Sequence, residues 1–172
     1  MKKLLLLLFI SATGTEIFAQ QLPNNGFETW IPSSNSTERP DQWHHLNEIL
    51  PSALALFVPA TWAKISPGYN GSSYCVKMKT VNATGQPANG ILTTGSIDYQ
   101  NQTITGGLAY TLKPDSLTGY YKYTPAGTDK GTIEIVLKDA NNIDTIAQAK
   151  FYTPNATVAT WTRFSAPLIY RN

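Results

Sequence analysis

The chain has 172 residues, with 13 basic and 11 acidic side chains and a formal net charge of +2. The charges are nearly balanced and form no run of one sign, so the sequence gives no reason to expect binding to nucleic acid or to an acidic membrane surface. The only cysteine, Cys75, excludes a disulfide within the chain.

The first residues, 1–19, have the layout of a secretory signal peptide. Lys2 and Lys3 form a positively charged start, residues 4–12 are almost entirely apolar, and Ala19 offers a small residue for cleavage. A membrane anchor is the alternative, but the apolar run is about half of the ~20 residues that a spanning helix needs. We therefore expect cleavage after Ala19 or Gln20, and a secreted or cell-surface protein with no membrane span.

The remaining residues, 20–172, predict a single all-β domain. Apolar and polar side chains alternate with period two at 73–81 and 131–138, which is typical of half-buried strands. Asn and Asp at 139–142 indicate a hairpin tip. Short strands separated by such turns favour an antiparallel β-sandwich of the jelly-roll kind. Further strands are expected at 27–31, 61–66, 90–97, 116–123, 145–152 and 160–170.

Two features fit this pattern less directly. The apolar residues of segment 46–58 are interrupted by Pro51, which argues against a long helix and leaves a short helix and a covering loop as alternatives. Cys75 lies in the alternating segment 73–81, so we expect it to face the core rather than to be a reactive thiol.

Aromatic side chains are the first candidates for a binding site. Sugar rings pack their C–H faces on flat aromatic rings, and neighbouring polar side chains bond the hydroxyls. Tyr120, Tyr121 and Tyr123, next to Lys122, supply this mixture in the predicted strand 116–123. Alternation places Tyr121 and Tyr123 on one face and Tyr120 on the other, and one of the two faces must be core.

The pair His44 and His45 is a second candidate. Neighbouring side chains on a strand point to opposite sides, so the two imidazoles are poorly placed to bind one metal ion. We interpret them as surface or rim histidines.

Several short motifs occur in an order that resembles a known family. They lie at 25–30 (Asn-Gly-Phe-Glu-Thr-Trp), 40–43, 90–95, 114–123, 160–164 and 169–170. Together they resemble the bacterial carbohydrate-metabolism domain abbreviated PCMD and, more loosely, jelly-roll carbohydrate-binding modules. The resemblance implies an exported jelly-roll sandwich linked to carbohydrate, and it carries over no catalytic residues.

The resemblance also implies a calcium site and a longer fold. In jelly-roll modules with a similar opening, the acid at the position of Glu28 helps to hold a structural calcium ion. The family continues beyond the strand at 160–164, so we expect the chain to stop before its sandwich is complete. A compact variant in which segment 46–58 caps the open edge is the alternative.

These observations lead to three functional hypotheses. The first is a non-catalytic extracellular module that binds a polysaccharide or other glycan. The second is a structural or adhesion domain that binds other surface proteins. The third is a glycosidase-like enzyme, although no acidic pair lies in a sequence context that marks it.

Overall fold

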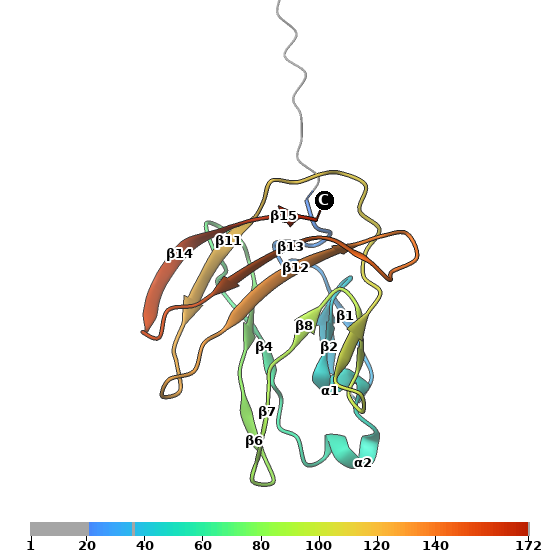
Figure 1. Ribbon diagram of the computed structural model, residues 1–172. Helices are drawn as coiled ribbons and strands as arrows, with labels where there is room; N and C mark the ends of the chain where they lie inside the picture. The colour runs from blue at the N-terminus through green and yellow to red at the C-terminus, as the bar shows by residue number, and fades with distance from the viewer. Residues whose placement is uncertain (1–20, 36, 172) are drawn as a thin grey trace, which may run out of the picture.

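A computed structural model describes residues 21–35 and 37–171, so the predicted signal peptide lies outside the described part of the chain. Strands hold 43% of the described residues and helices 5%, which confirms the all-β prediction (Figure 1). The strands pair in ladders of two or three strands each. Their jelly-roll arrangement stays a prediction.

The first half of the described chain is built from short antiparallel pairs (Figure 1). Strand β1 (Trp30–Pro32) pairs with β2 (Glu38–Pro40), and β3 (His44–His45) pairs with β8 (Leu92–Thr93). The pairs that follow are β4 (Trp62–Ile65) with β5 (Cys75–Met78), β6 (Val81–Ala83) with β7 (Gln86–Ala88), and β9 (Ser96–Asp98) with β10 (Thr103–Thr105).

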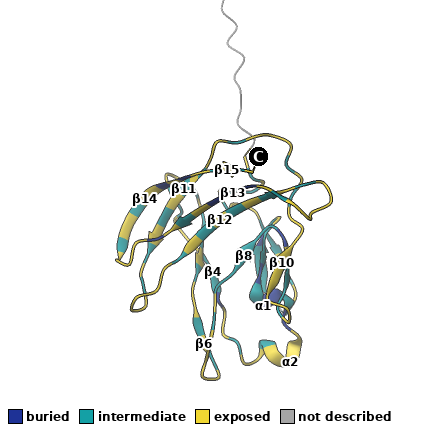
Figure 2. Cartoon of the chain, in the orientation of Figure 1, coloured by how far each residue is buried: buried dark blue, intermediate teal, exposed yellow. Residues whose placement is uncertain are grey.

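Segment 46–58 contains two single-turn helices, α1 (Leu46–Ile49) and α2 (Ser52–Ala55). Pro51 separates them, and Leu50 before it is extended with φ −66° and ψ 139°, as steric conflict with a following proline requires. The short-helix alternative is therefore confirmed for both sides of Pro51. Leu56 and Phe57 beyond α2 are 84% and 60% exposed, and α2 itself is exposed (Figure 2).

The second half contains the long strands, which form two ladders. Strand β11 (Ser116–Tyr123) pairs antiparallel with β14 (Val158–Pro167). Strand β13 (Thr145–Tyr152) pairs with β12 (Thr132–Lys138) on one side and with β15 (Ile169–Tyr170) on the other. The predicted hairpin tip at 139–142 is confirmed, because the Asp139 carboxylate accepts hydrogen bonds from the N–H groups of Ile143 and Asp144 at 2.8 and 3.1 Å.

Aromatic and small side chains from the two ladders meet in a core. The Phe151 and Phe164 rings stack with centroids 5.0 Å apart, and Tyr121 meets Phe151 edge-on at 5.2 Å. Phe164 covers Gly119 so closely that a Cβ at position 119 would lie 2.7 Å from its ring. The buried alanines of these ladders are Ala147, Ala149 and Ala166.

A second packing centre lies among the short strands. The Trp62 ring stacks with His45 at a centroid distance of 4.6 Å and with Trp30 at 5.8 Å. Asn47 of α1 is buried beside it, and its side-chain oxygen accepts hydrogen bonds from the N–H and hydroxyl of Thr61 at 2.9 and 2.8 Å. These contacts tie segment 46–58 to the start of β4.

Candidate functional site

Four side chains gather on the face of the β11–β14 ladder that carries Tyr120; two of them, Tyr120 and Lys122, are exposed, and Tyr69 and Trp161 are half-buried. Tyr120 and Lys122 project from β11, Trp161 projects from β14, and Tyr69 reaches the same surface from the loop between β4 and β5. We call these four residues the aromatic face. Period-two alternation explains it, because Tyr120 and Lys122 share one side of β11.

The rings of the aromatic face hold one another in place. Tyr69 and Tyr120 stack with centroids 3.7 Å apart and planes at 17°, and Trp161 meets Tyr69 edge-on at 6.0 Å. The Lys122 ammonium lies 5.1 Å from the Trp161 ring centre, within the range of a cation–π interaction. The nearby Tyr120 hydroxyl raises the pKa of Tyr69 above its ordinary value.

The structure separates the three tyrosines that the sequence offered as one platform. Tyr120 is 41% exposed on the outer surface. Tyr121 contacts Phe151 and Phe164 in the core, and the Tyr123 hydroxyl is buried with no hydrogen-bond partner among the described residues. Because Tyr121 packs in the core and the Tyr123 hydroxyl is buried, neither belongs to the aromatic face. Tyr69, far away in sequence, takes their place.

Glu28 lies where the opening segment meets the loop before β5. Its carboxylate accepts hydrogen bonds from the Ser72 hydroxyl and from the Tyr74 N–H, the latter at 3.4 Å, and the bond from Ser72 is the main cause of its lowered pKa. The Ser72 hydroxyl also lies 3.2 Å from the Gly26 carbonyl oxygen and 2.8 Å from that of Tyr74.

This group of oxygens bears on the implied calcium site. Glu28, Ser72 and the two carbonyls supply fewer oxygens than the six to eight that calcium takes. Among the described residues, no three His, Cys, Asp or Glu side chains gather in a way that could hold a metal ion. A calcium ion at Glu28 would need further oxygens, such as water, to complete its shell, and the site stays a prediction.

The two histidines have different surroundings, and the interpretation of both as surface or rim residues is wrong for His45. His45 is fully buried, because its ring packs on Trp62 and its Nδ1 accepts a hydrogen bond from the Glu48 N–H at the start of α1. Its Nε2 therefore carries the proton and donates it to the Glu38 carbonyl at 3.0 Å. The His44 side chain is 37% exposed.

The buried carboxylate of Glu48 joins α1 to residues of β2, of β3 and of the loop after β1. One oxygen lies 2.7 Å from His44 Nδ1 and accepts a hydrogen bond from the His45 N–H. The other accepts from the Ser33 hydroxyl and lies 3.3 Å from Arg39 Nε. The Glu48 side chain is 6% exposed, so these partners replace the water that the charge has lost.

Burial lowers the pKa of His45 below its ordinary value of 6.5, although the Glu38 carbonyl and Glu48 act in the opposite direction. The unfolded chain therefore binds a proton at a higher pH than the folded chain does, and stability falls as the pH drops below about 6.5. We expect the melting temperature to decrease between about pH 7 and about pH 5. Asparagine also caps helices but does not titrate, so His45→Asn is expected to show a shallower decrease. Equal decreases in both proteins would contradict the assignment.

Cys75 is half-buried on β5, as expected for a residue that packs rather than reacts. Burial raises the pKa of its thiol, and this outweighs the opposing effect of the Lys122 charge. The neutral thiol is the weaker nucleophile, so these surroundings do not favour a reactive cysteine.

No family model, curated protein or solved structure matches the chain. The candidate site therefore rests on the geometry of the described residues. In that part of the chain, no helix has the length and apolar character needed to cross a membrane.

Proposed function

We propose that the protein is an exported, non-catalytic module that binds a glycan through the aromatic face. The observation that carries the proposal is the stacked pair of Tyr69 and Tyr120 beside Trp161. Aromatic rings at a surface offer flat apolar area to the C–H faces of a sugar ring. Lys122 and Arg163, the latter directly opposite Tyr120 across the ladder, offer donors to its hydroxyl groups. The PCMD-like order of motifs and the N-terminal export pattern support the same proposal.

A glycan array on the purified protein, followed by calorimetric titration of the best ligand, tests the proposal. We expect Tyr120→Ala to weaken binding about fivefold, because one aromatic stacking contact contributes about 1 kcal/mol. Tyr152→Ala is the matched control, since Tyr152 is 57% exposed on the other ladder, away from the aromatic face. An array with no bound glycan, or equal affinity of the Tyr120 variant and the native chain, would refute the proposal.

A structural or adhesion domain is the second candidate, and one observation favours it. The outer surface of the β12–β13–β15 ladder exposes Val136, Ile146 and Ile169, with exposed fractions of 40%, 44% and 74%. Apolar side chains grouped on one sheet surface are a feature of protein–protein contacts. A negative array together with self-association in light scattering would favour this candidate over glycan binding.

A further inference from the structure

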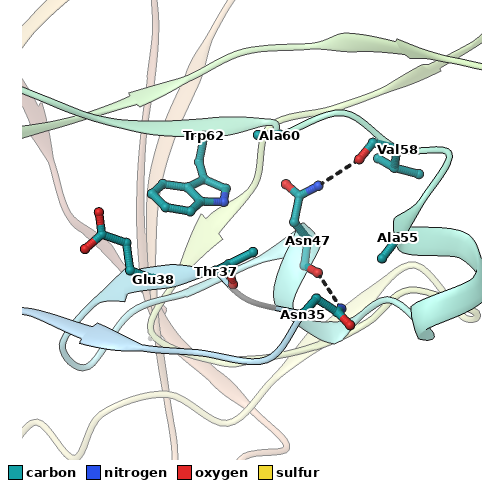
Figure 3. A pocket seen from close by; sticks show the side chains of 8 residues that line it. All are labelled: Asn35, Thr37, Glu38, Asn47, Ala55, Val58, Ala60 and Trp62. Atoms are coloured by element: carbon teal, nitrogen blue, oxygen red, sulfur yellow. Dashed lines mark hydrogen bonds between the residues drawn. The ribbon is translucent and has the colours of Figure 1, made fainter.

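Strand β12 has one edge without a partner strand among the described residues, because it pairs with β13 along its other edge only. Polar groups in the N-terminal half find partners within the chain. There the Asn47 amide donates to the Val58 carbonyl at 3.3 Å, and the Asn35 amide donates to the Asn47 carbonyl at 3.0 Å (Figure 3). The free edge of β12 instead offers its N–H and C=O groups to a further strand.

The inner face of β12 is also incompletely covered. Ile135 and Leu137 point to the same face as Ala149 and Ala147, their partners on β13. The two alanines are buried, with exposed fractions of 3% and 0%, whereas Ile135 and Leu137 are only half-buried. The large apolar side chains at this edge are therefore less covered than the small ones one strand further in. A strand added at the edge would remove more of their apolar surface from water.

The outer face of β12 carries the side chains that would select the added strand. Glu134, Val136 and Lys138 lie there in alternate positions, and all three are exposed. Charges on an edge strand oppose pairing with a strand that does not match them. Here one charge of each sign stands two residues from Val136, the acid before it and the base after it. The pattern is therefore complementary to its own copy running in the opposite direction.

We propose that two copies of the chain pair antiparallel through their β12 edges, about a two-fold axis that passes through Val136. In this register Glu134 of each copy lies opposite Lys138 of the other, and Ile135 lies opposite Leu137 on the inner face. Each of these contacts occurs twice because the interface is symmetric. An axis at Ile135 would pair more residues, but it would place Glu134 opposite Val136 and Lys138 opposite Thr132, with no ion pair directly across the interface.

The surroundings of the two charges suit this pairing. Lys150 lies 3.1 Å from Glu134, and the Gln148 amide donates to the same carboxylate, so Glu134 is held over the outer face of the ladder. The Lys138 ammonium lies 3.4 Å from the Asn142 carbonyl, a neutral acceptor, so its charge remains available for a carboxylate of the second copy. The pairing uses no residue of the aromatic face, so dimerisation and glycan binding can each fail alone.

Sedimentation velocity of the purified protein over a range of concentrations tests the inference. We expect a reversible equilibrium between monomer and dimer. Lys138→Glu is expected to raise the dissociation constant of the dimer about tenfold, because two cross-strand ion pairs become two like-charge pairs. Glu134→Lys is expected to have the same effect for the same reason. Lys77→Glu is the matched control, since it makes the same change of charge at an exposed position of β5 and should leave the dissociation constant unchanged.

A mixture of the two charge variants separates loss of this interface from loss of folding. The Glu134→Lys chain carries lysine at both positions and the Lys138→Glu chain carries glutamate at both, so together they should form a heterodimer with both ion pairs restored. A native chain that stays monomeric at every concentration would overturn the inference and leave the edge to a different protein. A dimer that neither charge variant weakens, or a mixture that does not recover dimers, would overturn it as well.

Discussion

Replacing Phe164 by alanine is expected to lower the free energy of unfolding by about 3–5 kcal/mol, the cost typical of removing a buried phenylalanine ring. Phe164 is 6% exposed and stacks on Phe151 across the two ladders. Gly119 leaves a flat surface on which the ring lies, and no neighbouring Cβ is present there to fill the space left behind. A domain of this size is typically stable by about 5–15 kcal/mol, so the variant approaches the limit of folding.

Urea denaturation followed by circular dichroism measures this effect. Tyr152→Ala is a matched control, since it also deletes an aromatic ring from a ladder strand but at a position that is 57% exposed. The control should lose much less stability than the Phe164 variant. Similar losses in the two proteins would show that the ladders do not share a core.

Replacing Glu48 by alanine is expected to cost about 3–5 kcal/mol, because removal of one partner leaves the other charge of a buried pair without compensation. Arg39, with a side chain that is 20% exposed, would lose its carboxylate. The Ser33 hydroxyl and the His45 N–H would lose their acceptors, and α1 would lose its capping interaction. The effect should therefore exceed that of an ordinary ion-pair deletion.

Glu134→Ala provides that comparison. Glu134 lies 3.1 Å from Lys150, but the two side chains are 31% and 35% exposed, and exposed pairs contribute about 0–1 kcal/mol. Thermal melts of both variants give the ranking. A loss at Glu48 no larger than the loss at Glu134 would show that the Glu48 carboxylate is hydrated rather than held by its partners.

The long strands could be predicted from sequence because their pattern is local. The predicted strands at 116–123 and 145–152 have the same bounds as β11 and β13, since Pro, Asn and Asp mark turns on both sides of each. Strands β2 and β3 carry Glu, Arg, Pro and two histidines, and Glu and Pro are depleted in strands. Their pairing depends on the partners of Glu48 and on the Trp62 stack, which form only in the folded chain.

The candidate site, too, could be predicted from the sequence only in part. Alternation placed Tyr120 and Tyr121 on opposite faces, but it could not decide which face would be buried. Tyr69 follows a turn-rich stretch, and nothing in its local sequence indicates that it stacks on Tyr120.

The β12–β13 hairpin lies in sequence between the paired strands β11 and β14. We expect this arrangement to set the order in which the two ladders fold. The β12–β13 hairpin closes through a short turn at Asp139, and such hairpins form in about 1–10 μs. Strands β11 and β14 pair across the chain that contains this hairpin, with Tyr123 opposite Val158, so their pairing needs the closure of a much longer loop. We expect the hairpin to form first and to bring the ends of that loop together. During synthesis, β11 then stays unpaired until β14 has emerged from the ribosome.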